Sequence, residues 1–306
     1  MALHLAQLSD LHVQAPGATN DLGYDSNAAL AAAVERVVGL APQPDVVVLT
    51  GDLTDHGTPE EFAQLLELLA PLPMQLLPVA GNHDERLGLA DAFPDIDTTG
   101  PAPFWQWTRD LGEVRLIGLD TTIEGRHDGE LCATRLEWLD AELTAAPEQP
   151  TVIAMHHPPF ETGIWWMDAG ALRTGGDAMQ AVVGRHPQVR RVLCGHHHRS
   201  IVTSWGPTVV SVAPSTSHQI HYDLVPESSA RTSDEAAAFH VHVCAGDQIV
   251  THVVACAMPE VLDLGRVFGG WESFRDGLRD GRPMFKAPPR SADGDGRERI
   301  DAGEGA

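Results

Sequence analysis

A short polar loop with two carboxylates follows one of the most apolar segments of the chain. The β-branched run at residues 46–49 is typical of a buried strand, and Thr50-Gly51-Asp52-Leu53-Thr54-Asp55 comes directly after it. Gly51 lets other groups approach closely, and folding alone gives little reason for a carboxylate at this place. We therefore expect Asp52 to be a ligand. If two metal ions share it, the other ligands should also lie where strands end.

Strand and helix patterns alternate over the first two-thirds of the chain. Helix patterns cover residues 25–40, 58–69, 134–143 and 179–183, and the second and third of these begin with the capping-box sequences Thr58-Pro59-Glu60-Glu61 and Thr134-Arg135-Leu136-Glu137. Strand candidates cover 3–9, 75–79, 113–119, 151–155 and 189–193, and four more follow at 200–205, 208–213, 239–244 and 248–255. This order predicts an α/β fold in which two sheets pack face to face with helices outside.

The balance of charge limits the partners that the chain can have. Its 306 residues include 43 acidic and 20 basic side chains, which gives a formal net charge of -23. Such a surface repels polyphosphate backbones and anionic membranes, so nucleic acid polymers are excluded as expected partners. Small substrates are favoured, and divalent cations bound by carboxylates would locally neutralise part of the acidic excess.

Cysteine usage and hydropathy bear on the location of the protein. Four cysteines, with no CxxC pair among them, do not form a disulfide scaffold, so we expect reduced thiols. Residues 1–5 carry no basic or long apolar run, and Glu67 and three prolines interrupt the apolar stretch at 62–79. We expect a cytoplasmic protein without a membrane span.

Polar residues with metal-binding side chains occur at five of the expected strand ends. They are Asp10-x-His12, Asp52, Asn82-His83, His156 and His196-x-His198. Ligands gather outside the carboxyl ends of strands in α/β sheets, so these distant positions can converge. Oxygen and imidazole ligands suit manganese, iron or zinc, and the absence of cysteine argues against a closed structural zinc site. Alternation along an extended chain would let Asp10 and His12 reach one ion together.

These motifs, in this order, resemble the calcineurin-like metallophosphoesterases. The pattern D-x-H, G-D-x-x-D, G-N-H-D, H and G-H-x-H runs across residues 10–198. The forms Gly81-Asn82-His83-Asp84 and His156-His157-Pro158-Pro159 look most like bacterial class III cyclic nucleotide phosphodiesterases and glycerophosphodiesterases. The resemblance implies a four-layer α-β-β-α sandwich of two mixed sheets with flanking helices.

The resemblance also implies a set of ligands. Asp10, His12, Asp52 and His198 would bind one divalent metal ion, and Asp52, Asn82, His156 and His196 would bind the other. Asp52 would bridge the two. A pair of ions about 3.5–4 Å apart can hold a bridging hydroxide and steady both oxygens of an in-line displacement. His83 would stabilise charge or protonate the leaving alkoxide, and Asp55 would orient a histidine, unless it is merely a loop or cap residue.

The leading hypothesis is a dinuclear metal-dependent phosphodiesterase acting on a 3′,5′-cyclic nucleotide or a glycerophosphodiester. A phosphomonoesterase, a nucleotide pyrophosphatase and a non-catalytic metal-binding regulatory protein remain alternatives. His157 and His197 could face the substrate, orient a ligand or be structural, and Trp165 and Trp166 could form a rim over the substrate or pack in a small core or subunit contact.

Three parts are expected along the chain: a catalytic domain at 1–257, an extension at 258–286 and a disordered tail at 287–306. The aromatic residues at 261–284 could form a helix that contacts the body, closes over the site or joins a second subunit. Since relatives of this kind are often oligomers, we expect a homo-oligomer, with a dimer as the simplest case.

Overall fold

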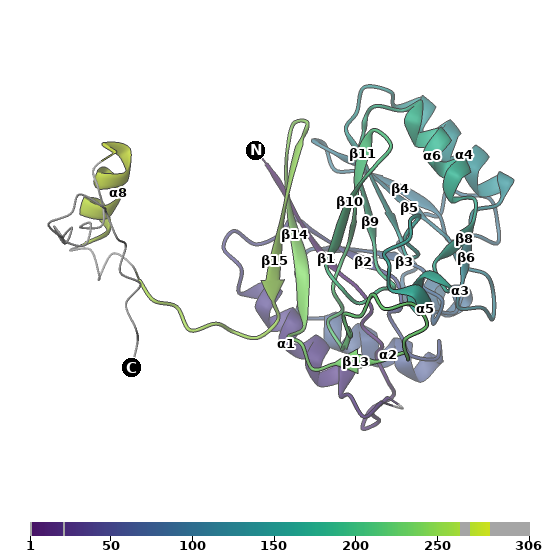
Figure 1. Ribbon diagram of the computed structural model, residues 1–306, viewed down its shortest axis with the longest axis horizontal. Helices are drawn as coiled ribbons and strands as arrows, with labels where there is room; N and C mark the ends of the chain where they lie inside the picture. Colours follow the sequence, from purple (N-terminus) through teal and green to yellow (C-terminus); the bar gives the residue numbers. More distant parts are fainter. Residues whose placement is uncertain (1, 21, 264–269, 282–306) are drawn as a thin grey trace, which may run out of the picture. The chain divides into compact units, whose positions relative to one another are not determined.

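The computed structural model describes residues 2–20, 22–263 and 270–281. Contacts within the chain divide it into two units, of which the first ends at Met258 and the second begins at Pro259 (Figure 1). The second unit contains α8 (Trp271–Arg279), which places Trp271, Phe274 and Leu278 in a helix as expected. The tail predicted at 287–306 lies outside the described residues, and the role of the extension stays a prediction.

The first sheet has five strands in the order β15-β14-β1-β2-β3. The strands β1 (Leu3–Leu8), β2 (Val46–Thr50) and β3 (Gln75–Val79) run parallel, while β14 (Ala238–Ala245) pairs antiparallel with both β1 and β15 (Gln248–Ala255). Because β1, β2 and β3 are parallel, the residues that follow them emerge at the same edge of the sheet.

The second sheet has six strands in the order β10-β11-β9-β7-β5-β4. Its central strands β5 (Arg115–Leu119), β7 (Thr151–Met155), β9 (Val189–Cys194) and β11 (Thr208–Val212) are parallel, and β4 (Trp107–Asp110) and β10 (Ile201–Trp205) are antiparallel edge strands. Both sheets are therefore mixed, as predicted.

Helices cover the outer faces of the two sheets. Helices α1 (Ser26–Val38) and α2 (Pro59–Leu69) pack together on one side of the molecule, and α4 (Ala133–Ala145) and α6 (Gly176–Gly184) pack together on the other (Figure 1). Strand β7 shows the layering: Val152 and Ala154 belong to the core between the sheets, whereas Ile153 and Met155 pack with α4 and α6. The predicted four-layer sandwich is confirmed.

The capping-box pattern predicted the start of α2 correctly and the start of α4 wrongly. Thr58 caps α2 with the expected reciprocal hydrogen bonds to Glu61. Helix α4, however, begins at Ala133 after Cys132, and no side chain caps it, so Thr134 lies inside the helix. Arg135 is buried and donates to the backbone oxygens of Asp120 and Thr122, so its tertiary contacts fix the start of α4 in place of the local pattern.

Short elements in the loops complete the fold. Helices α3 (Arg86–Ala92) and α5 (Trp165–Asp168) were not predicted from the sequence. The short strands pair as β6 (Gly129–Glu130) with β8 (Leu172–Thr174) and β12 (Gln219–Ile220) with β13 (Thr232–Ser233). In the part of the chain that the structure describes, no helix combines the length and the apolar character that a membrane crossing requires.

Candidate metal centre

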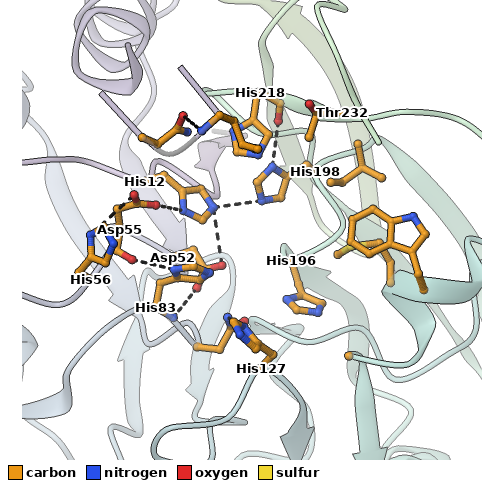
Figure 2. A pocket seen from close by; sticks show the side chains of 17 residues that line it. His12, Asp52, Asp55, His56, His83, His127, His196, His198, His218 and Thr232 are labelled. Carbon is orange, nitrogen blue, oxygen red and sulfur yellow. Dashed lines mark hydrogen bonds and ion pairs between the residues drawn. The ribbon is translucent and has the colours of Figure 1, made fainter. Parts of the chain in front are cut away.

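The two sheets present their strand ends to one another at a single place. Asp10 and His12 follow β1, Asp52 follows β2, and His156 and His196 follow strands of the second sheet. The backbone N–H of His196 donates to Asp10 Oδ1 at 2.9 Å, which joins the two sheets at this edge. Figure 2 shows His12, Asp52, His196 and His198 around the resulting cavity. The convergence expected from the parallel strands is therefore present.

Five residues of this cluster have a left-handed backbone. The φ angles of Asp10, His12, Asp52, His196 and His198 are 53°, 47°, 51°, 70° and 47°. Each such residue costs about 1–3 kcal/mol and persists only where its surroundings hold it. Here the N–H groups of Asp10 and His12 donate to the carbonyl oxygens of Gly51 and Asp52, each at 3.0 Å. The expectation that Asp10 and His12 share a side by extended-strand alternation is wrong, because tight turns aim both side chains inward.

Two glycines allow these turns to approach one another. A Cβ atom on Gly81 would lie 2.0 Å from the backbone nitrogen of Asp52, and one on Gly195 would lie 2.1 Å from Ser9 Oγ. Neither distance is sterically possible, so a side chain at either position would force the loops apart. The close packing of these loops therefore requires a glycine before Asn82 and before His196.

Three imidazoles are each held through one ring nitrogen. Nδ1 of His12 lies 3.0 Å from Asp55 Oδ1, Nδ1 of His156 lies 2.8 Å from the Thr50 carbonyl oxygen, and Nδ1 of His198 lies 2.9 Å from the His218 carbonyl oxygen. Since each acceptor takes the Nδ1 proton, each ring directs its Nε2 atom toward the other groups of the cluster. Metal-binding histidines in proteins are oriented in this manner.

The side chains of four candidate ligands bring their ligand atoms close together. Ligand atoms of Asp10, His12, Asp52 and His198 all lie within 4.8 Å of one another, and Nε2 of His12 is 3.1 Å from Nε2 of His198. A proton on one of these nitrogens, or a metal ion between them, makes so short a distance favourable. Asp10 Oδ2 is buried and lacks a hydrogen-bond partner among the described residues. The donor set therefore fits a divalent ion.

A second set of candidate ligands, which includes His156, Asn82 and His196, shares Asp52 with the first. The Oδ2 atom of Asp52 lies 3.3 Å from Nε2 of His156 and 3.8 Å from Nε2 of His12, so Asp52 lies between the two sets. Asn82 Oδ1 is 3.1 Å from the same His156 nitrogen, and the rings of His156 and His196 are 5.1 Å apart. This arrangement suits a second cation with Asp52 shared.

The buried charges shift one another's pKa in opposite directions. Burial raises the pKa of Asp10 to about 6. Burial alone would lower the pKa of His156, but the negative charge of Asp52 outweighs it and raises the pKa to about 9. Burial would raise the pKa of Asp52, yet the charges of His156 and His83 hold it well below its usual range. Asp52 is therefore the carboxylate on which positive charge converges.

His83 is held on the cavity wall by its neighbours. Its backbone N–H donates to Asp52 Oδ1 at 3.0 Å, and its ring Nδ1 donates to the backbone carbonyl oxygen of Asp55 at 2.8 Å. Nε2 is thus left available to a molecule in the cavity that the residue lines. The adjacent Asp84, to which no role was assigned from the sequence, accepts from the backbone N–H groups of Leu53, Thr54 and Gly81 and so ties the two ligand loops together.

A cavity of about 730 Å³ opens from the cluster. Besides the candidate ligands it is lined by His127 and His218, which Figure 2 labels, and by Trp166, Met167, Gly170 and Ile220. The His218 ring stacks on Tyr24 at 5.0 Å, and Asn82 Nδ2 lies 3.5 Å from His127 Nδ1. Histidines in loops after strands were the available signal for His127 and His218.

The two remaining histidines of the motifs are engaged elsewhere. His157 is close to His156 and His196, but its Nδ1 is 2.8 Å from Thr121 Oγ1 and its Nε2 is 3.0 Å from the His127 carbonyl oxygen. Both nitrogens are occupied, so we exclude it from the ligand set despite its proximity. Burial lowers its pKa to about 3. His197 instead faces Asp168, with Nε2 and Oδ1 3.3 Å apart.

Comparison with known families identifies this arrangement. Residues 3–200 match the model of the family described as calcineurin-like phosphoesterase. The chain belongs to this family. The resemblance inferred from the five motifs is thereby confirmed, and family members use a pair of divalent metals of the kind that the cluster fits.

Curated relatives cover most of the chain. It is 32% identical to a probable glycerophosphodiester phosphodiesterase GpdQ of Arcobacter nitrofigilis, over 81% of this chain and 91% of that protein. It is 33% identical to the 3′,5′-cyclic adenosine monophosphate phosphodiesterase CpdA of Pseudomonas aeruginosa, over 76% of this chain and 82% of that protein. It is also 32% identical to a 3′,5′-cyclic-nucleotide phosphodiesterase of a Nostoc species, over 79% and 84%.

Solved structures share the fold at low sequence identity. A dimetal phosphatase from Danio rerio aligns with a TM-score of 0.60 and 16% identity, covering 83% of this chain and 96% of that one. A purple acid phosphatase from yellow lupin aligns with a TM-score of 0.65 and 13% identity, covering 86% and 53%. Both support the four-layer fold.

Proposed function

We propose that this protein hydrolyses small phosphodiesters at a pair of divalent metal ions. The observation that carries the proposal is the convergence of the His12 and His156 Nε2 atoms on Asp52 and of the His198 Nε2 atom on Asp10. An acceptor holds each ring at Nδ1. The preference for a diester over a monoester rests on relatives that are named as glycerophosphodiester or cyclic nucleotide phosphodiesterases.

Asp52 would belong to both metal sites. In this proposal the first ion is held by Asp10, His12, Asp52 and His198, and the second by Asp52, Asn82, His156 and His196. When bound, such ions supply a nucleophile at neutral pH and offset the charge of the phosphoryl oxygens. Nitrogen and oxygen donors of this kind suit manganese, iron and zinc.

His83 would act on the leaving group. Its Nδ1 donates to the Asp55 carbonyl oxygen, so the ring is fixed with Nε2 available on the cavity side. A protonated Nε2 can donate to the departing alkoxide, and general acid catalysis of this kind is typically worth about 10²–10⁴-fold in rate. Asp55 Oδ1 would hold His12 in the orientation that presents Nε2 to the first ion.

The cavity offers room for the organic part of a diester. Its volume of about 730 Å³ is in the range of small-molecule sites, and Trp166, Met167 and Ile220 contribute apolar lining. A 3′,5′-cyclic nucleotide and a glycerophosphodiester both fit this description, and both remain candidate substrates. A homo-oligomeric state and a cytoplasmic location remain predictions of the sequence.

A single purified preparation tests the proposal. Its bound metal would be quantified, and its turnover measured with bis(4-nitrophenyl) phosphate, 4-nitrophenyl phosphate, cyclic AMP and glycerophosphocholine after loading with manganese, iron or zinc. We expect the aryl diester and at least one natural diester to be hydrolysed faster than the monoester. Monoester turnover far above diester turnover would favour a phosphomonoesterase, and stoichiometric metal without any turnover would favour a regulatory metal-binding protein. The Asp52→Ala variant controls for contaminating enzymes.

A further inference from the structure

The middle histidine of the triplet at residues 196–198 points away from the candidate metal centre. His197 is completely buried, and its Nε2 lies 3.3 Å from Asp168 Oδ1, on the segment that follows His156. Its neighbours on both sides line the cavity, whereas His197 does not. The contact of this buried imidazole is therefore with the segment that carries Asp168, and not with the metal centre.

The Asp168 carboxylate accepts several hydrogen bonds from that segment. Oδ1 accepts from the backbone N–H and the hydroxyl of Thr162, both at 2.8 Å, and Oδ2 accepts from the backbone N–H of Gly163 at 2.8 Å. With His197, four donors meet on one side chain. Helix α5 spans only Trp165–Asp168, too short to be stable through its own hydrogen bonds, so this carboxylate closes residues 162–168 into a fixed loop.

The same segment forms one wall of the cavity. Trp166, Met167 and Gly170 line it, and we call residues 162–170 the α5 wall. A Cβ atom on Gly170 would lie 3.4 Å from Nε2 of His196, so the wall packs directly against a candidate ligand. The triplet thus touches the wall twice, by packing at His196 and by a hydrogen bond at His197.

The α5 wall also rests on the chain after the metal motifs. Ile164 and Met167 form a small apolar cluster with Ile220, and Trp165 Nε1 donates to the Ser228 carbonyl oxygen at 2.8 Å. These contacts hold the wall against the loop at 220–228, but they do not tie it to the metal motifs. The Asp168–His197 pair is the hydrogen bond that does so.

We propose that Asp168 and His197 are positioning residues that set the distance between the α5 wall and the candidate metal centre, and so select diesters with a flat apolar substituent that packs on Trp166 and Met167. The inference rests on the proposed diesterase function. In this proposal His197 affects substrate selection by holding the α5 wall, and it neither binds a metal ion nor transfers a proton.

Asp168→Asn provides the primary test. The amide has one acceptor oxygen in place of two, so it cannot accept from Thr162, Gly163 and His197 together. We expect KM for bis(4-nitrophenyl) phosphate to rise about fivefold to tenfold with kcat and metal content unchanged. In methyl 4-nitrophenyl phosphate the aryl group leaves and a methyl group stays on phosphorus. Because the wall is taken to contact the substituent that stays, the KM for this diester should change less than twofold. Glu161→Gln, which removes an exposed carboxylate beside the wall, is the matched control and should behave as wild type.

A double-mutant cycle separates positioning from general destabilisation. If Asp168 acts through the wall, Asp168→Asn should add less than about twofold to KM once Trp166→Ala has removed the indole. Thr162→Val removes one donor without removing the carboxylate and should give a smaller effect of the same kind. Additive effects in the cycle, an equal rise in KM for both diesters, or loss of metal from Asp168→Asn would each overturn the inference.

Hydrogen exchange tests the anchor without relying on turnover. Amides of residues 162–170 should exchange faster in Asp168→Asn than in wild type, while those of β7 and β9 stay unchanged. Unchanged exchange in the wall would overturn the inference even if the protein hydrolyses diesters. If wild type hydrolyses no diester with any metal, the proposed function fails, and the exchange measurement still decides whether Asp168 anchors the wall.

Discussion

Two groups of buried histidines in this protein have opposite surroundings. At the candidate metal centre, burial alone would lower the pKa of His12 and His156, but Asp55 and Asp52 beside His12 and Asp52 beside His156 raise it. On β14, His240 and His242 are equally buried, and burial lowers the pKa of both. The first pair lies beside negative charge, whereas the second is kept neutral.

The chemical nature of the groups around each ring explains the difference. His242 uses both nitrogens, with Nδ1 2.9 Å from Thr251 Oγ1 and Nε2 3.0 Å from Gln7 Oε1. His240 bonds Ser200 Oγ at 3.0 Å. Among the described residues, no group of side chains able to hold a metal includes either of them. Burial of a histidine is therefore a weak signal for metal binding, and an Nε2 atom directed at a carboxylate is a stronger one.

The largest expected effect is that of Asp52→Ala. Because Asp52 Oδ2 stands between His12 and His156, its loss should weaken both metal sites and lower diester turnover by at least roughly a thousandfold. Metal analysis after dialysis and steady-state kinetics measure the two effects. His242→Gln, in the other histidine group, is the control and should keep its metals; retention of both metals by Asp52→Ala would contradict the shared-ligand assignment.

His83→Ala should separate catalysis from metal binding. The backbone N–H that reaches Asp52 is preserved, so both metals should stay bound while kcat falls about 10²–10⁴-fold. Metal content and kcat measured on one preparation provide the check. A variant that loses a metal together with its rate would show that His83 belongs with the ligands rather than with the catalytic groups.

Asp55→Asn should have a smaller effect on the first metal only. The amide oxygen can still accept from His12 Nδ1, but without a negative charge, so metal affinity should drop about tenfold. Titration of the metal-free protein with manganese gives the affinity of each site. Equal weakening of both sites, or none, would leave Asp55 as a loop residue without a role in orienting His12.

The β14 histidines predict a modest pH dependence of stability. Burial, helped by the charge of Arg191, lowers the pKa of His240 from 6.5 to about 4. The unfolded chain then binds more protons than the folded one between these values, so stability present above pH 6.5 is lost as pH falls toward 4, by about 3 kcal/mol at most.

Urea unfolding of the EDTA-treated protein measures this dependence. His240→Phe should reduce the loss of stability between pH 6.5 and 4 while leaving diester turnover at pH 7.5 unchanged. The absolute stability of the variant does not matter, since only the slope against pH is compared. An unchanged slope would show that other groups, such as His242, account for the acid sensitivity.

Much of the fold could be predicted from the sequence because its signals are local. The apolar run of β2 and the capping box at Thr58 are confirmed. The signal at Thr134 failed because Arg135 makes buried contacts with residues that precede α4. Short elements such as α5 have no periodicity from which to be recognised, since Asp168 and the surrounding structure hold them.

The site was predictable as a set of strand ends but not as geometry. The convergence of Asp10, Asp52 and His156 followed from parallel strands. The left-handed turns at Asp10 and His12 could not be anticipated, because only contacts between loops stabilise them. Likewise His127 and His218 reach the cavity through tertiary packing. Each is a histidine in a loop after a strand, but the local sequence does not tell which of these loops faces the site.

The meeting of the two sheets at Asp10 and His196 has a consequence for the mechanics of the molecule. Ions held there would join β1 to β9 across most of the chain's length, much as a disulfide does, but through bonds that a chelator can open. Resistance to unfolding should then depend on free metal concentration, so metal supply would tune the lifetime of the protein as well as its activity.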